Sequence, residues 1–368
     1  MGVIEGLDRL RVQRASSPRE MPADATAHFG TVFTDHMFLM RYDAGRGWHD
    51  PEIKPLEPLA LMPGTSVLHY GQAVFDGLKG FRGKDGQVRL FRPEMHAQRL
   101  RRSAERLAIP PLEEEWVVES FLRLVDVDRR WVPGERGTAL YLRPTIVAAD
   151  PAIGLHPAHS YVYFLILCPV GAYYAESGPV SIVADEQFVR AAPGGLGAAK
   201  TPANYAASLL AAERAKEAGY TQVLWLDAVE RRWIEEVGTM NIMARFGDEV
   251  VTPPLGGTIL AGVTRDSALT LMRSWGLKVS ERPIAIEAMI AAAKDGTLTE
   301  VWGTGTAAVV SAVGEIGWRG ERVQVNGGKP GALTRRLYDG LTAIQYGEAP
   351  DPFGWTVPVP AYNYPAYN

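Results

Sequence analysis

Hydrophobic and polar positions follow two different periods along the chain, and each period predicts one kind of element. Between Pro93 and about Leu107, apolar or small residues recur at i, i+3, i+4 and i+7, which gives a helix one buried face. Short apolar runs bounded by Gly, Pro or charged turns predict strands. Further helices are predicted at 113–127, 202–218, 265–275 and 286–293. Strands are predicted at 31–41, 88–91, 139–147, 161–168, 180–183, 222–226, 233–237, 242–245 and 250–252, and around 301 and 309.

The order of these elements predicts two domains. Strands and helices mix without a repeated βαβ register, which favours two mixed α+β domains over a doubly wound sheet. A stretch rich in turn formers falls between the two halves. We therefore expect a small domain at 1–172, a linker at 173–180 and a larger domain at 181–368. The tail from Pro358 is rich in Pro, Tyr and Asn and is expected to pack loosely.

Composition narrows the class of protein. The 368 residues are 46% apolar and 22% charged, typical of a globular chain, and the net charge of 38 − 42 = −4 offers no basic surface for nucleic acid or anionic membrane. The start lacks the apolar core of a signal peptide, and the longest apolar run, 161–170, is too short to cross a bilayer. The single cysteine, Cys168, forms no internal disulfide, which favours the cytoplasm.

The loop before Lys200 carries the most chemical information. Gly194, Gly195 and Gly197 permit unusual backbone angles and a close approach of a ligand. A helix is predicted to begin two residues later, so the positive end of its dipole lies near the lysine. Positive surroundings and loss of water both favour the neutral, nucleophilic amine. The alternative interpretation is a solvated lysine at the start of a helix.

A second interpretation of the same segment is a phosphate-binding loop. Residues 194–201 differ in one position from the pattern G-x-x-x-x-G-K-[ST], and the strand at 223–226 ends in Asp227, as a magnesium-supporting strand would. Ala199 and Pro202 count against it, because a β-carbon hinders the loop and proline lacks a backbone donor.

Three other segments are candidates for ligand binding. The acidic pair Glu235 and Glu236 ends an apolar strand, so it is either a solvated turn or a buried carboxylate facing a cationic ring nitrogen. Gly262 precedes a helix whose first amides could bind an anion, and 303–308 is a Gly-rich turn with further amides. On the helix from Pro93, Arg99 is the arginine best placed to point inward.

Metal catalysis and serine hydrolysis are poorly supported. His156 and His159 flank a Pro-Ala pair rather than sharing a helical face, and we expect no metal site. The other five histidines, which form no metal pattern with them, are at 28, 36, 49, 69 and 96. There is no G-x-S-x-G motif.

Taken together, these segments resemble the branched-chain amino acid aminotransferases, pyridoxal-phosphate enzymes of fold type IV. The resemblance extends from Phe29 to about Gly347, with the family motifs in family order at 29–37, 70–83, 88–107, 141–144, 194–205, 236–241 and 303–307. It implies two α+β domains with the cofactor between them. It also implies transamination of leucine, isoleucine and valine with 2-oxoglutarate.

The resemblance also implies roles for individual residues. Lys200 matches the lysine that binds pyridoxal phosphate covalently and acts in catalysis, Glu236 the carboxylate at the pyridine nitrogen, and Tyr205 the tyrosine at the ring's 3′ oxygen. Arg99, Val263, Thr264 and Thr306 match the family residues that bind the cofactor's phosphate, and Arg190 matches a family arginine near the same site.

Substrate-binding roles follow in the same way. The amides of Thr306 and Ala307 match the family's hydrogen-bond donors to the substrate's α-carboxylate. Arg143 matches the family residue that receives the distal carboxylate of glutamate. The family residues that line the pocket for the substrate's side chain are matched by five positions, Phe29, Tyr70, Phe75, Tyr141 and Thr239. Ile153 and Leu155 match a loop that closes the neighbouring subunit's pocket, which implies a homodimer.

One departure and two alternatives accompany the resemblance. Where animal members carry a redox-sensitive C-x-x-C, this chain has Ala308 and Ser311, so that thiol switch is absent. The D-amino-acid aminotransferases and the aminodeoxychorismate lyases share the lysine and the glutamate. The segments 33–37 and 238–242 favour the branched-chain group.

Overall fold

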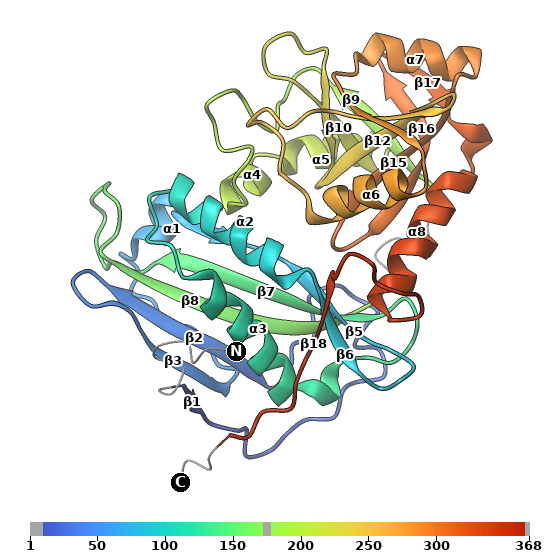
Figure 1. Cartoon of the computed structure of the whole chain (residues 1–368). Helices are drawn as coiled ribbons and strands as arrows, with labels where there is room; N and C mark the ends of the chain where they lie inside the picture. The colour runs from blue at the N-terminus through green and yellow to red at the C-terminus, as the bar shows by residue number, and fades with distance from the viewer. Residues whose placement is uncertain (1–9, 172–177, 365–368) are drawn as a thin grey trace. The chain divides into compact units, whose positions relative to one another are not determined.

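Two compact units make up the chain in a computed structural model, which describes residues 10–171 and 178–364 (Figure 1). The first unit comprises the residues up to 172, the segment 199–202 and the residues from 344 onward. The second unit comprises 173–198 and 203–343. The segment 199–202, which contains Lys200, is thus part of the first unit although both of its flanks belong to the second.

The first unit is built on a nine-stranded sheet in the order β1-β3-β2-β8-β7-β5-β6-β18, with β4 also paired to β7. Every pairing in it is antiparallel except β1 with β3. Its strands are β1 (Arg11–Val12), β2 (His36–Asp43), β3 (Gly47–Pro55), β4 (Ala73–Phe75), β5 (Leu78–Arg82), β6 (Val88–Phe91), β7 (Ala139–Ala148), β8 (Ser160–Val170) and β18 (Thr356–Pro358).

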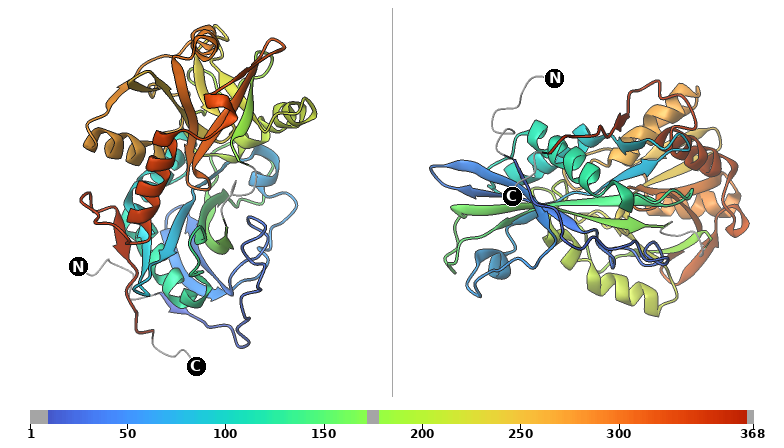
Figure 2. Two further views of the ribbon diagram at one scale, coloured as in Figure 1. Left: turned by 90° about the vertical axis from the view of Figure 1, so that its right-hand side faces the viewer. Right: turned by 90° about the horizontal axis from the view of Figure 1, so that it is seen from below.

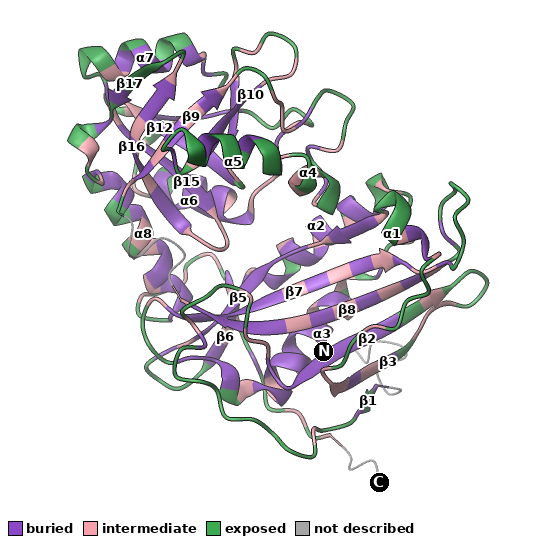
Figure 3. Cartoon of the chain, turned by 180° about the vertical axis from the view of Figure 1, so that it is seen from behind, coloured by how far each residue is buried: buried purple, intermediate pink, exposed green. Residues whose placement is uncertain are grey.

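Two helices cover one face of this sheet, α2 (Pro93–Arg106) and α3 (Glu114–Val127), as Figures 1 and 2 show. Their apolar stripes share one core with inward residues of the strands, among them Phe121 of α3, Leu140 of β7 and Leu165 of β8. Along much of β7 and β8, buried and intermediate residues alternate (Figure 3), and the intermediate ones lie on the opposite face. Because side chains alternate along a strand, Tyr141 and Arg143 project from the face that α2 and α3 leave uncovered.

The second unit holds another nine-stranded sheet, in the order β11-β10-β9-β16-β15-β12-β13-β14 with β17 on β16. Because β11 also pairs with β12, six of the strands close into a barrel. The strands are β9 (Val180–Asp185), β10 (Gln222–Leu226), β11 (Ile234–Val237), β12 (Met240–Phe246), β13 (Glu249–Thr252), β14 (Lys278–Glu281), β15 (Leu298–Gly305), β16 (Val309–Trp318) and β17 (Glu321–Gln324). The remaining helices are α1 (Ser66–Tyr70) in the first unit, and α4 (Pro202–Ala206), α5 (Leu209–Glu217), α6 (Val263–Ser274), α7 (Ile286–Asp295) and α8 (Ala332–Gln345).

The helix predicted at 202–218 is two helices, α4 and α5. Both the amide and the hydroxyl of Ser208 donate to the carbonyl of Tyr205, at 3.1 and 2.8 Å, which takes that carbonyl out of a continuous helical ladder. Gly219, with φ +80°, follows the end of α5 as predicted. The strand predicted at 31–41 begins only at His36, because residues 28–35 form turns.

The end of the chain packs on the first unit, which corrects two predictions. β18 pairs antiparallel with β6, and Val359 is buried in the first unit's core, with its amide donating to the carbonyl of Val88 at 2.8 Å. The tail is therefore anchored as far as Tyr364, and residues from 344 onward do not belong with the predicted second domain. The predicted linker at 173–180 lies largely outside the described residues, so this boundary stays a prediction.

No helix within residues 10–171 and 178–364 combines the length and the apolar character needed to cross a membrane.

Candidate active site

Lys200 is fixed to the first unit by its backbone. Its amide donates to the hydroxyl of Ser103 on α2 at 2.9 Å, and its carbonyl accepts from the amide of Phe75 at 3.0 Å. The next residue, Thr201, donates its hydroxyl to the carbonyl of Ala73 at 2.9 Å. The Lys200 amine lies 5.0 Å from the centre of the Phe75 ring. The backbone of this lysine is therefore held against the edge of β4 and against α2.

A buried carboxylate, Asp76, organises the side chains next to Lys200. Its two oxygens accept from Nε and Nη2 of Arg99 at 2.8 and 2.7 Å, and from Nδ1 of His96 at 2.7 Å. Burial alone would raise the pKa of Asp76, but the charge of Arg99 and these hydrogen bonds hold that pKa well below its usual range. Burial lowers the pKa of His96 in spite of the carboxylate. Arg99 points inward, as predicted.

The predicted substrate pocket residues of the first unit are connected by ring contacts. Phe75 and Tyr141 lie under the guanidinium of Arg143, at 4.8 and 5.2 Å from its central carbon, and Arg143 donates to the Tyr141 hydroxyl at 3.0 Å. Phe29 packs edge-on against Tyr141 at 4.9 Å. A β-carbon at Gly77 would lie 1.8 Å from the Tyr141 hydroxyl, so any larger residue there would displace the Tyr141 ring. The group combines apolar rings with one fixed positive charge.

Sequence reasoning missed several residues of this region. Asp76 and Ser103 were not singled out, and neither was Lys79, which is buried beside Tyr141 in the strand register and whose pKa burial lowers to about 8. His96 and Arg99 are three residues apart on α2, and that spacing indicates a shared helical face. The chain carries no local signal that Asp76 is their partner.

In the second unit, Glu236 is a buried carboxylate on β11. Its Oε1 accepts from the amide of Leu260 at 2.7 Å, and its Oε2 is 2.9 Å from Nε of Arg190. Glu235 is also buried, which raises its pKa, and it accepts a short hydrogen bond from the hydroxyl of Thr258. The acidic pair is therefore not a solvated turn, and Glu236 is held as a hydrogen-bond acceptor inside the unit.

Glu236 lines a pocket together with two other predicted residues, Tyr205 and Thr239. The remaining lining residues are Arg190, Asn204, Ser208, Gly238 and Leu260. Asn204, which follows the glycine-rich loop, donates its amide to the carbonyl of Leu196 within that loop at 2.9 Å. The second unit thus brings a carboxylate and a tyrosine side chain to one pocket.

The strand register connects Glu236 with the predicted anion-binding segments. Glu236 pairs with Asn241 on β12, and Asn241 pairs with Thr304 on β15, so the three side chains lie in one row across the barrel. A β-carbon at Gly262 would lie 2.0 Å from the amide oxygen of Asn241. Glycine there brings the N-terminus of α6, with Val263 and Thr264, against this row. Thr306 and Ala307 follow β15 in the turn before β16.

Tyr70, Ile153 and Leu155 form a separate, solvent-exposed group in the first unit. The Tyr70 hydroxyl donates a short hydrogen bond to the carbonyl of Ile153. Ile153 is 66% exposed and Leu155 is 83% exposed. Both are in the loop between β7 and β8.

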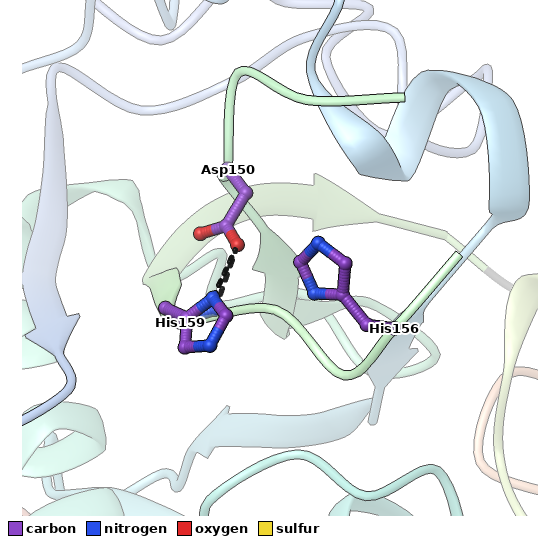
Figure 4. A group of neighbouring side chains, drawn as sticks. All are labelled: Asp150, His156 and His159. Carbon is purple, nitrogen blue, oxygen red and sulfur yellow. Dashed lines mark hydrogen bonds and ion pairs between the residues drawn. The ribbon is translucent and has the colours of Figure 1, made fainter. Parts of the chain in front are cut away.

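The same loop brings His156 and His159 close to Asp150 (Figure 4). This arrangement differs from the expectation that the histidines form no metal pattern. The local sequence did not predict it, because the loop must fold back on itself to bring Asp150 beside His159, whose ring centre lies 5.1 Å from that of His156.

The alternative of a phosphate-binding loop does not fit the structure. Asp227 accepts four backbone amides of its own turn, from residues 229, 230, 232 and 233, at 2.7–3.0 Å. Its carboxylate therefore caps a turn. The helix after Lys200 spans only Pro202–Ala206.

Comparison with known proteins defines the class to which this fold and these residues belong. The sequence model of amino-transferase class IV matches residues 73–316, and the chain belongs to that family.

Within the family, the chain is similar to proteins of one kind. It is 50% identical over 353 residues to branched-chain-amino-acid aminotransferase 2 of Bacillus subtilis strain 168, covering 96% of this chain and 97% of that one. It is 51% identical over 343 residues to branched-chain-amino-acid transaminase 1 of the same organism, covering 93% of this chain and 96% of that one. The crystal structure of the Escherichia coli branched-chain amino acid aminotransferase superposes with a TM-score of 0.75 at 26% identity, covering 89% of this chain and 99% of that chain.

Asp76→Asn tests the buried network, because it keeps the shape of the side chain and removes its charge. At neutral pH we expect the free energy of unfolding to fall by about 3–5 kcal/mol, since Arg99 loses its buried partner. The folded pKa of Asp76 lies below that of the unfolded chain, about 3.9, so the stabilisation is complete above that value and is lost as pH falls. The difference between wild type and variant should therefore shrink below about pH 4.

Urea unfolding followed by fluorescence between pH 7 and pH 3 measures this difference. Asp24→Asn, at an exposed aspartate, is the matched control and should leave the free energy of unfolding unchanged. A difference between wild type and D76N that stays constant down to pH 3 would contradict the role given to the Asp76 charge.

Proposed function

We propose that this protein transfers the amino group of branched-chain L-amino acids to 2-oxoglutarate, with pyridoxal 5′-phosphate as cofactor. The observation that carries this proposal is the identity of about 50% to the two Bacillus subtilis aminotransferases over almost the whole chain. Lys200 and Glu236, the two residues the reaction needs most, are both present and both held by their surroundings.

The second unit fits the cofactor in charge and hydrogen bonding. Glu236 is a buried acceptor in a pocket, which suits a protonated ring nitrogen, and the Tyr205 hydroxyl in the same pocket suits the ring oxygen. Val263 and Thr264 begin a twelve-residue helix, whose first amides and positive dipole end suit a phosphate. Lys200 and Tyr205 are five positions apart, so chain length alone keeps their α-carbons within about 18 Å.

Pyridoxal phosphate, when bound, supplies an aldehyde carbon for the amino group and a ring that takes up the electrons left at Cα. Lys200 would hold the cofactor, and its Nζ would take the substrate's Cα proton and later return it, first as base and then as acid. Glu236 keeps a negative charge beside the ring nitrogen, and Arg190 with the Leu260 amide keeps that carboxylate in place.

The substrate side must accept an isobutyl group and a carboxylate in turn. Phe29, Phe75 and Tyr141 offer apolar ring surface, while Arg143, which also contacts Tyr141, offers a positive charge for the distal carboxylate of glutamate. We propose that these residues share one pocket for both substrates. Such a pocket separates leucine, isoleucine and valine weakly, because one methylene contributes only about 1–3 kcal/mol.

An activity assay with chemical labelling tests the function. The purified protein should transaminate L-leucine with 2-oxoglutarate and leave D-alanine unchanged. Borohydride reduction followed by mass spectrometry should find the cofactor's mass on Lys200. Turnover of D-alanine alone would contradict the proposed substrate class, and a label on another lysine would contradict the role of Lys200.

Glu236→Gln tests the carboxylate at the ring nitrogen. Glutamine keeps the size of the side chain but removes its charge, so we expect kcat to fall about 10²–10³-fold, as for the loss of one preorganised electrostatic partner. The matched control is Glu235→Gln, because Glu235 is the neighbouring buried glutamate and contacts Thr258 instead. Steady-state kinetics with L-leucine, with circular dichroism to verify folding, measures both variants. Equal losses in the two variants would refute the specific role of Glu236.

We also propose a homodimer, in which Ile153 and Leu155 of one chain approach the substrate pocket of the other. The support is that both large apolar side chains are mostly exposed on the single chain. Light scattering should give twice the 40.2 kDa of one chain. Leu155→Asp should weaken the dimer at least tenfold, whereas Val229→Asp, at a valine that is 75% exposed, should not. A monomeric wild type, or an unaffected L155D dimer, would contradict the proposal.

We propose that the protein is cytoplasmic, because its single cysteine, Cys168, is a free thiol. This thiol is free and buried, and burial raises its pKa to about 11, so little reactive thiolate forms. Fractionation of the producing cells with antibody detection tests the location, and recovery outside the cytoplasmic fraction would contradict it.

A further inference from the structure

The loop between β7 and β8 gathers three side chains that could bind a metal ion. Asp150, His156 and His159 each present one ligand atom, and these atoms lie within 4.8 Å of one another (Figure 4). Both histidines are exposed, whereas Asp150 is only 7% exposed. The proposed transamination uses none of the three.

The carboxylate of Asp150 is held in place by the loop's own backbone. Its Oδ1 accepts from the amide and the hydroxyl of Ser160, at 2.7 and 2.6 Å. Its Oδ2 accepts from the amide of His159 at 2.8 Å. Hydrogen bonds of this kind orient a ligand before a metal arrives, so little side-chain freedom remains to be lost on binding.

The two imidazoles are arranged as metal ligands require. Nδ1 of His156 is 2.9 Å from the carbonyl of Pro157, and a carbonyl can only accept, so this nitrogen carries the proton and Nε2 keeps its lone pair. Nδ1 of His159 donates to Oδ2 of Asp150 at 3.3 Å, because a carboxylate oxygen can only accept, and a metal ion would take the place of that proton. Two ligands of a tetrahedral zinc ion, each about 2.0–2.1 Å from the metal, are separated by about 3.4 Å. The aspartate and His159 are therefore already at ligand spacing.

We propose that Asp150, His156 and His159 form a binding site for a divalent transition-metal ion of the zinc type. Two imidazole nitrogens and one carboxylate oxygen form a ligand set that zinc accepts, with water completing the tetrahedron. Calcium and magnesium prefer all-oxygen sites and would bind here poorly. Separations within 4.8 Å can close to ligand spacing by rotation of the exposed imidazoles.

A bound ion would brace the loop that carries Ile153 and Leu155, because its ligands lie on both sides of these residues. The base of this loop is already joined to the segment before it, since the Ser66 amide donates to the Asp150 carbonyl at 2.9 Å. The second half of the loop is also tied to other elements, since the carbonyl of His159 accepts from the Ala44 amide at 2.8 Å and the Ala158 amide donates to the Gln72 side chain at 3.2 Å. A metal ion bound by His156 would add a link from the middle of the loop to Asp150, and we expect slower hydrogen exchange at residues 150–159.

Zinc binding to the pyridoxal-phosphate-loaded protein tests the site. After treatment with EDTA and its removal, equilibrium dialysis against zinc chloride should give one zinc ion per chain that calcium does not displace. His156→Gln and His159→Gln should each weaken binding at least tenfold, and hydrogen exchange at 150–159 should slow in wild type only. Both histidines are exposed, so these variants should fold normally.

The matched control is His49→Gln, because His49 contacts two carboxylates, Asp43 and Asp50, without a second histidine. It should bind zinc like wild type. The proposal is overturned if wild type binds no zinc at 100-fold molar excess, if H156Q and H159Q bind it as tightly as wild type, or if H49Q weakens binding equally. None of these readouts depends on transamination, so the site and the proposed function can fail independently.

Discussion

The guanidinium of Arg190 joins three parts of the second unit that are distant in sequence. Its Nη1 donates to the carbonyl of Thr258, its Nη2 to the carbonyl of Gly197, and its Nε faces Glu236. A carboxylate as deeply buried as Glu236 is costly unless a positive charge and hydrogen bonds surround it. The glycine-rich loop, the segment at Thr258 and strand β11 must therefore assemble together. This also explains Gly197, where a β-carbon would lie 2.2 Å from the Thr258 carbonyl oxygen.

The first unit meets the same requirement with a different set of residues. Asp76 is fully buried, and Arg99 engages both of its oxygens with a planar, two-pronged geometry that lysine does not provide. This pair fixes α2 against the turn that follows β4. Since α2 also supplies Ser103 to the Lys200 amide, one ion pair sets the position of the helix to which the lysine is attached. In both units an arginine–carboxylate pair orients the neighbouring segments, and removal of one partner would leave a buried charge unpaired.

The elements that sequence predicted well are those whose signal is local. Strand β6 and helix α2 agree with prediction almost to the residue, because a turn, a proline at the first helical position and a regular stripe mark them. Helix α8 was missed although Leu333, Leu337 and Leu341 have helical spacing. β18 could not be predicted, since three residues become a strand only through pairing with β6, more than 260 positions earlier.

The same distinction applies to the sites. Resemblance to a family indicates Lys200 and Glu236, but a single sequence gives no sign that Asp76 is the partner of Arg99. Their hydrogen bonds span 23 positions and exist only when β4 and α2 are packed. Buried polar pairs depend on which segments meet in space, and hydrophobic period carries no information about that choice.

The β7–β8 loop reverses the usual distribution of polar and apolar residues. Its aspartate is buried and its two large apolar residues, Ile153 and Leu155, are exposed, at a cost of about 1.5–3 kcal/mol for each apolar side chain left in water. The hydrogen bonds of Asp150 therefore hold the base of the loop, and burial of its tip does not. A partner that covers Ile153 and Leu155 and a metal ion that binds Asp150 would both act on the conformation of this loop. If the metal changes the affinity for the partner, thermodynamic linkage requires that the partner change the affinity for the metal by the same factor.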